Sequence, residues 1–216
     1  MKKLKKEKIK TNKSRLIIIG SFLIIGICTL TISLTLLNNY KNDKEEDKNL
    51  NVFFEVQEQI NIEQKEVIEE KQEQKEEVKH YDTESYLGVL EIKKIGLTKG
   101  FYSINSKNNR VNKTIQIIKE SKMPDEDKGN LIIAGHSGNA YISYFRNLNK
   151  LSYGDIATVY YNGRTYNYKL VNTYEIEKTG TAHIKRNGEK NTLTLITCKH
   201  NTNKQLVFIF ELNEII

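Results

Sequence analysis

The sequence predicts a mainly β domain preceded by one apolar helix and a charged spacer. Residues 16–37 carry no charge, residues 38–80 are strongly acidic, and short β-branched runs alternate with turn signals from residue 81 onward. The chain has 216 residues and is 38% hydrophobic. This length suits one domain with appendages, and the low apolar fraction indicates that part of the chain lies outside a core. Two cysteines exclude a disulfide-dense scaffold and a four-thiolate zinc site.

The N-terminal segment has the features of a membrane anchor. Residues 1–15 hold eight Lys and Arg and one acid, a net charge of +7. As a helix, the uncharged run 16–37 reaches about 33 Å, enough to cross a hydrocarbon core of about 30 Å. We therefore expect an uncleaved signal-anchor at the cell membrane, with a cytoplasmic basic tail and with residues 38–216 outside. Cys28, within the span, is expected to be a packing residue, with acylation as the alternative.

Residues 38–80 are predicted to be a charged extracellular stalk. They hold seven Lys and thirteen acids, a net charge of −6, with few apolar residues. Phe53, Ile60 and Val67 recur every seven residues, but this heptad pattern is too short to predict a coiled coil. The composition favours a solvated helical or disordered spacer.

Residues 81–216 are predicted to form the working domain. Asn162-Gly163 separates two alternating runs, which is a strong hairpin signal. Residues 114–120 read as a short helix. About seven short strands favour a mainly antiparallel barrel or sandwich. The basic residues are scattered, and no nucleic-acid-binding motif is visible. Strands are expected at 86–92, 131–134, 156–161, 164–171, 192–197 and 206–212.

Two reactive side chains follow apolar strands. His136 comes after Leu-Ile-Ile-Ala-Gly, and Cys198 comes after Leu-Thr-Leu-Ile-Thr. An imidazole can activate a thiol and later protonate a leaving amine. The alternatives are a buried structural cysteine and a histidine in a turn. His183 and His200 are competing imidazoles, His80 at the stalk boundary is expected to be solvated, and the residues do not favour a metal site.

These motifs resemble those of the sortase family. The run 129–136 resembles the strand that carries the sortase histidine, and 192–198 resembles the Thr-Leu-x-Thr-Cys strand. The segment 144–155 is similar to the one that follows the histidine, and 87–97 to the first strand. The resemblance covers roughly residues 85–213.

The resemblance implies an eight-stranded barrel and a cysteine transpeptidase without a cofactor. Cys198 would be the nucleophile and His136 the general acid and base. Its partners would be surface proteins bearing a C-terminal sorting signal such as Leu-Pro-x-Thr-Gly, with a cell-wall precursor or pilin amine as acceptor on a Gram-positive surface. No apolar segment follows Ile216 and the stretch 174–192 is short, which favours a class A-like or D-like enzyme.

One position departs from the family pattern. Sortases carry an arginine at the start of the last strand, where this chain has Gln205. A glutamine amide can donate to an oxyanion but brings no charge. Gln205 is therefore the candidate for stabilising the oxyanion or substrate, and neighbouring Lys204 is an alternative. Arg146 and Arg164 are expected to be solvated.

Several other functions compete with this interpretation. The missing arginine also fits a degenerate sortase-like domain that binds or assembles partners with little or no turnover. Papain-like enzymes place Cys before His, and L,D-transpeptidases place a Ser-x-Gly-Cys cluster shortly after the His, so both are disfavoured. A signalling anchor with a β sensor domain would need an intracellular effector, and residues 1–15 are too short to hold one.

Overall fold

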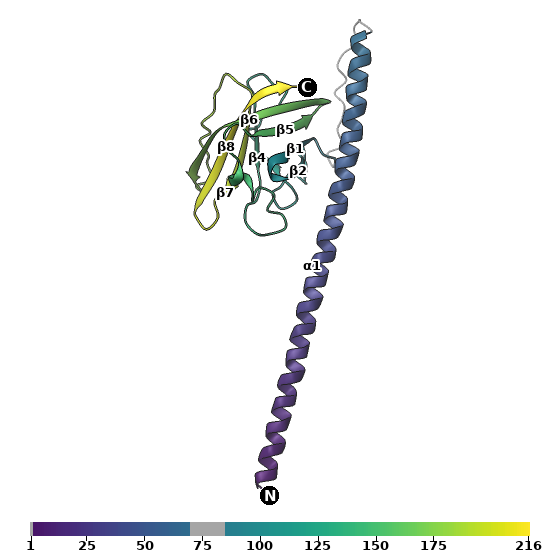
Figure 1. The fold of residues 1–216 in the computed structure, drawn as a ribbon, viewed down its shortest axis with the longest axis vertical. Helices are drawn as coiled ribbons and strands as arrows, with labels where there is room; N and C mark the ends of the chain where they lie inside the picture. Colours follow the sequence, from purple (N-terminus) through teal and green to yellow (C-terminus); the bar gives the residue numbers. More distant parts are fainter. Residues whose placement is uncertain (1, 70–84) are drawn as a thin grey trace. The chain divides into compact units, whose positions relative to one another are not determined.

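The protein is described by a computed structural model that covers residues 2–69 and 85–216. The chain divides into two compact units, Met1–Glu45 and Glu46–Ile216. Helix α1 runs from Lys2 to Glu69 and belongs to both units (Figure 1). The predicted boundary at residue 81 and the last part of the predicted stalk lie outside the described residues, as do the side chains of the predicted basic tail.

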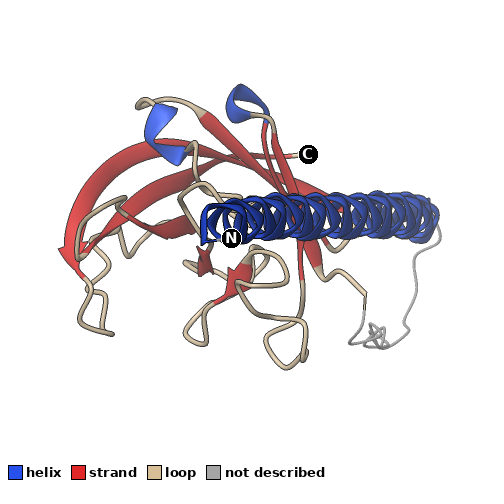
Figure 2. Cartoon of the chain, turned by 90° about the horizontal axis from the view of Figure 1, so that it is seen from below, coloured by secondary structure: helices blue, strands red, loops and turns tan. Residues whose placement is uncertain are grey.

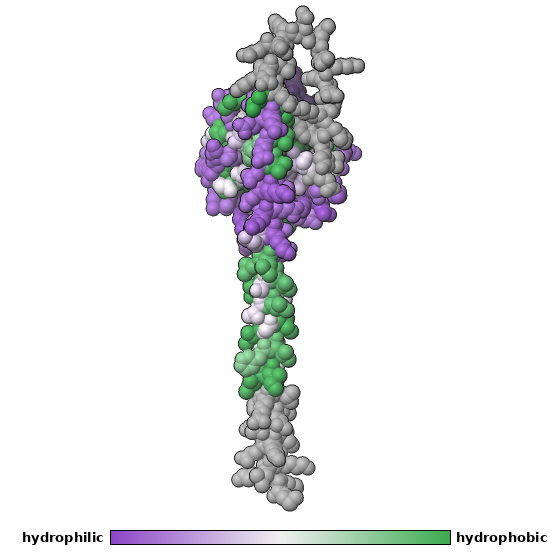
Figure 3. All heavy atoms as spheres, turned by 90° about the vertical axis from the view of Figure 1, so that its right-hand side faces the viewer, coloured by the Kyte–Doolittle hydropathy of each residue, from purple (hydrophilic) through white to green (hydrophobic). Residues whose placement is uncertain are grey.

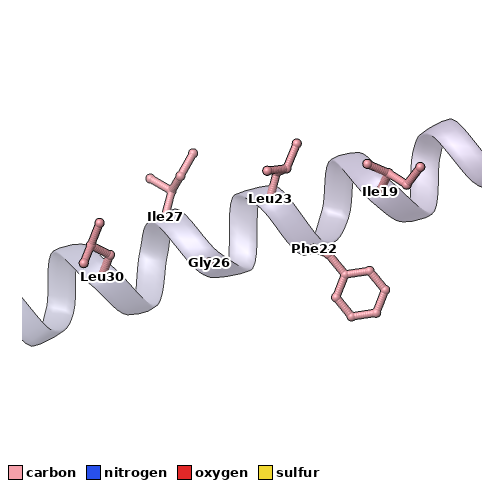
Figure 4. A pocket seen from close by; sticks show the side chains of 6 residues that line it. All are labelled: Ile19, Phe22, Leu23, Gly26, Ile27 and Leu30. Carbon is pink, nitrogen blue, oxygen red and sulfur yellow. The ribbon is translucent and has the colours of Figure 1, made fainter.

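In the first unit, the stretch of α1 from Ile18 to Leu37 carries no charge and exposes its large apolar side chains. This helix is long and apolar enough to cross a membrane, and its exposed apolar surface is the green band in Figure 3. Hydroxyl groups in this segment donate to carbonyls of their own helix, as Thr29 does to Gly26 at 2.9 Å and Thr35 to Thr31 at 2.8 Å. A lipid-exposed helix needs such internal partners. Figure 4 shows the apolar side chains around a shallow hollow beside Gly26.

The second unit is built on one eight-stranded sheet in the order β2-β1-β5-β6-β8-β7-β4-β3. An isolated parallel bridge between Phe101 and Ile115 brings the two ends of this order together, so the sheet is a nearly closed barrel joined by loops and two short 3-10 helices (Figure 2). The predicted mainly β, eight-stranded barrel behind an apolar helix is confirmed. The elements are β1 Gly88–Ile92, η1 Lys93–Ile95, β2 Leu97–Phe101, β3 Gln116–Ile117, β4 Asn130–Ala134, η2 Leu148–Lys150, β5 Ile156–Tyr161, β6 Arg164–Glu177, β7 Thr192–Cys198 and β8 Lys204–Ile215.

Alternating side chains fill the barrel interior. In β6, Tyr166, Tyr168 and Leu170 are each at most 1% exposed and join apolar residues of the other strands in one core. The turn before β6 has the positive φ angles of a tight hairpin, 50° at Asn162 and 75° at Gly163, as the Asn-Gly signal predicts.

The predicted helix at 114–120 is wrong. The segment contains β3, which pairs antiparallel with β4. Ile115 and Ile117 are both buried, and Gln116 between them is only half-buried, which is the period of a strand rather than of a helix. Thr114 also donates from Oγ1 to the carbonyl of Gly100 at 2.7 Å, which holds the segment extended beside β2.

Within the second unit, α1 packs on β1, β2 and β5. Phe53 is 5% exposed and lies in a cluster with Tyr86, Val89 and Tyr102. The Tyr86 hydroxyl donates to Glu46 Oε2 at 2.8 Å, and burial together with the Glu46 charge raises the pKa of Tyr86. This part of the predicted spacer is therefore helical and in contact with the domain. Phe53 and Ile60, the first two residues of the short heptad pattern, are both buried.

Replacing Phe53 with alanine is expected to lower the free energy of unfolding of the domain by about 3 kcal/mol, because a buried aromatic ring is lost. The neighbouring Phe54 is the matched control, since it is 37% exposed and makes an edge contact with Tyr160. Its replacement is expected to cost about 1 kcal/mol. Denaturant unfolding of the detergent-solubilised chain measures both values, and equal losses would contradict a docked helix.

Candidate active site

His136 follows β4, two residues beyond its last strand residue. The strand forms because Leu131, Ile132 and Ile133 are all buried, with Leu131 and Ile133 in the barrel core. Gly135 lies between the strand and His136, where an added Cβ would come within 2.7 Å of the Phe145 ring. The amide of Phe145 also donates to the His136 carbonyl at 2.9 Å. Close packing of the segment that follows therefore fixes the backbone at His136.

Cys198 is the last residue of β7, the parallel neighbour of β4. The pairing matches Ala134 with Ile196, so His136 and Cys198 each lie two residues beyond a paired position. Carboxyl ends of parallel strands meet at one edge of the sheet. The structure therefore brings the two predicted reactive residues to the same edge. The Cys198 side chain is half-buried and forms no disulfide.

Gln205 lies opposite Cys198 on the antiparallel strand β8. The next pair outward is Lys199 with Lys204, and the Lys199 amide donates to the Lys204 carbonyl at 2.9 Å. Antiparallel ladders alternate between bonded and non-bonded pairs, and side chains are closest in the non-bonded ones. Cys198 and Gln205 form such a non-bonded pair, so their side chains share one face of the sheet at short range.

Lys204 has a different environment from Gln205. Neighbouring strand residues point to opposite faces, and the Lys204 ammonium lies 3.5 Å from Glu175 Oε2. Glu175 also accepts a hydrogen bond from Lys199, and these two lysines lower the pKa of the Glu175 carboxyl, with the Lys199 bond as the main cause. The geometry thus favours Gln205 over Lys204 as the group nearest the thiol.

The competing polar residues lie in other places. His183 and His200 are exposed in loops, and His80 lies outside the described residues. Arg164 begins β6 at the Asn-Gly turn. Arg146 is exposed, as expected, and it also donates to the Ser143 and Ala140 carbonyls at 3.0 and 2.6 Å in the loop after His136. Among the described residues, no three His, Cys, Asp or Glu side chains gather as a metal site.

An apolar cluster beside Cys198 was not predicted from the sequence. By strand alternation, Ile196 and Val207 share the face of Cys198 and Gln205, and both belong to a cluster separate from the barrel core. Ala182 and Ile184 from the β6–β7 loop pack partly exposed against it. Ile196 and Val207 are buried, so the part of the cluster that a peptide could reach is the partly exposed pair from the loop, and apolar residues beside a reactive group can bind the apolar part of a peptide. Its members come from four strands and two loops, so no local sequence pattern reveals it.

The chain matches the family model of the sortase domain over residues 90–212. This match covers more than half of the chain, and the protein therefore belongs to the sortase family. No curated protein sequence matches it significantly.

Solved structures share the fold at low sequence identity. A sortase D5 transpeptidase from Clostridium perfringens is 23% identical, with a TM-score of 0.59, over 78% of this chain and 98% of that one. Sortase C-3 from Streptococcus pneumoniae is 21% identical, with a TM-score of 0.56, over 74% and 82%. A lid mutant of sortase A from Corynebacterium diphtheriae is 18% identical, with a TM-score of 0.55, over 63% and 74%.

Proposed function

We propose that this sortase is an active cysteine transpeptidase anchored in the cell membrane by residues 16–37, with its N-terminus in the cytoplasm. It cleaves an LPxTG-like C-terminal sorting signal and transfers the protein to a cell-wall or pilin amine. The observation that carries the proposal is the meeting of His136, Cys198 and Gln205 at the ends of three adjacent strands, β4, β7 and β8.

In the first half of the reaction, the Cys198 thiolate attacks the carbonyl carbon of the Thr–Gly bond. A carbon–sulfur bond forms, the carbon–nitrogen bond breaks, and the imidazolium of His136 gives its proton to the leaving amine. Gln205 donates from its amide to the oxyanion that develops on the carbonyl oxygen.

In the second half, the acceptor amine attacks the thioester. An amide bond forms, the Cys198 thiolate leaves, and His136 takes the proton that the amine loses. Ala182 and Ile184, which pack partly exposed on the buried apolar cluster beside Cys198, would hold the apolar residues of the sorting signal near the thiol.

The experiment is trapping of the acyl-enzyme. The detergent-solubilised chain is incubated with an LPxTG peptide, and intact mass with peptide mapping is expected to place a peptidyl adduct on Cys198, which triglycine then releases as a ligated product. The Cys198→Ala variant is the matched control and should form no adduct. Cleavage that is equal in both proteins would overturn the proposal.

The second candidate is a binding or assembly protein without turnover. The observation in its favour is that an uncharged glutamine faces Cys198 where the family carries an arginine. Binding of the peptide with neither adduct nor product in the same experiment would select it.

A further inference from the structure

Two side-chain hydroxyls connect the strand ends that carry His136 and Cys198. The Ser137 hydroxyl donates to the main-chain carbonyl of Cys198. Thr197 donates from Oγ1 to the carbonyl of Gly135 at 2.8 Å. The arrangement is reciprocal. Ser137, directly after His136, bonds to Cys198. Thr197, directly before Cys198, bonds to Gly135, directly before His136.

These bonds continue the sheet beyond the point where backbone pairing ends. The last paired residues are Ala134 and Ile196, and the Gly135 amide still donates to the Ile196 carbonyl at 3.1 Å. Further along, a parallel ladder would need main-chain amides as donors. The hydroxyls of Thr197 and Ser137 serve as donors to the next two carbonyls, those of Gly135 and Cys198.

The position of these donors determines what they fix. Thr197 is 3% exposed, so water competes little for its bond, and Ser137 is half-buried. His136 lies between two residues, Gly135 and Ser137, that both bond to β7. The Ser137 bond ends on Cys198 itself, so it sets the backbone of the nucleophile relative to the backbone of the imidazole.

We propose that Ser137 is a positioning residue of this active site, acting through the Cys198 carbonyl without touching the substrate. The inference rests on the proposed function for its turnover readout. A displacement of about 1 Å between reacting groups can cost about a hundredfold in rate. Loss of this hydroxyl is therefore expected to reduce kcat with little change in KM, because Ala182 and Ile184, the proposed peptide contacts, stay in place.

The test compares Ser137→Ala with Ser137→Thr, which keeps a hydroxyl, in the full chain in detergent. Ser121 is the matched control, since its hydroxyl donates to a main-chain carbonyl of β4, that of Ile132, at 3.0 Å, away from the site. We expect S137A to lower kcat about 10- to 100-fold and to change KM less than about threefold. S137T should stay near wild type, and S121A should keep its kcat.

A second readout needs no peptide substrate. The rate of Cys198 alkylation by iodoacetamide is followed against pH by peptide mapping, which separates Cys198 from Cys28. Thiol reactivity depends on a nearby imidazole, so S137A should change this profile and S137T should restore it. If S137A changes kcat and the alkylation profile no more than S121A does, the positioning role of Ser137 is overturned. A wild-type chain that cleaves no peptide would defeat the proposed function, while the alkylation profiles would still decide the role of Ser137.

Discussion

Replacing His136 with glutamine is expected to lower kcat/KM for peptide transfer by about 10²- to 10⁴-fold, the usual contribution of a positioned acid and base. Glutamine has a similar size and can form hydrogen bonds, but it does not exchange a proton near neutral pH. The imidazole is needed twice, once to protonate the leaving amine and once to accept the proton of the incoming amine. Initial rates of ligation of an LPxTG peptide to triglycine measure the loss.

His200 and His183 provide the matched controls for this prediction. His200 lies two residues after Cys198 in the β7–β8 turn, and both side chains are exposed. H200Q and H183Q are expected to keep rates within about twofold of wild type, because solvated side chains away from a site usually have small effects. A loss in H200Q as large as in H136Q would show that the thiol pairs locally with His200 instead.

Replacing Gln205 with arginine is expected to raise kcat about tenfold. Gln205 faces Cys198 across β8 and β7, and a hydrogen bond from a charged donor is roughly twice as strong as a neutral one. The carbonyl oxygen is neutral in the bound substrate and gains negative charge in the transition state. A charged donor therefore stabilises the transition state more than the bound substrate, so kcat should rise more than KM falls. Single-turnover acylation of Cys198, followed by mass, measures the effect.

Two further variants test whether the effect belongs to this face of β8. Gln205→Ala removes the donor and should reduce acylation about a hundredfold. Lys204→Arg keeps a charge on the opposite face, beside Glu175, and should leave the rate unchanged. If Q205R does not accelerate the reaction and Q205A does not slow it, another group stabilises the oxyanion.

The parts of the fold that were predictable are those with a local signal. The two strands joined by Asn162-Gly163 end and begin at the predicted residues, Tyr161 and Arg164, because this tight turn type favours Asn-Gly. The strand Leu97–Phe101 was missed because a lysine and a glycine interrupt its apolar residues. β6 extends to Glu177, six residues beyond the prediction, because its polar end is held by pairing with β8 rather than by an apolar pattern.

The candidate site also has parts that were predictable from local sequence and parts that were not. His136 and Cys198 could be selected because each follows an apolar run that ends abruptly. The register of β4 against β7, which brings these residues to one edge, could not be predicted, because it depends on a parallel pairing between distant segments. The role of Ser137 was invisible for the same reason, because its partner lies 61 residues along the chain. The burial of Phe53 could not be predicted, because the heptad pattern that contains it is too short to interpret alone.

The parallel pairing of β4 and β7 has a consequence for the order of folding. Gly135 and Thr197 meet across 62 residues, and β5 and β6 occupy the chain between them. Contacts between such distant segments are slow to form because the intervening chain must first lose its freedom. In a chain that is still folding, the Cys198 thiol and the His136 imidazole are therefore far from each other. Cys198, the proposed nucleophile, would therefore become competent late, when the barrel is nearly complete.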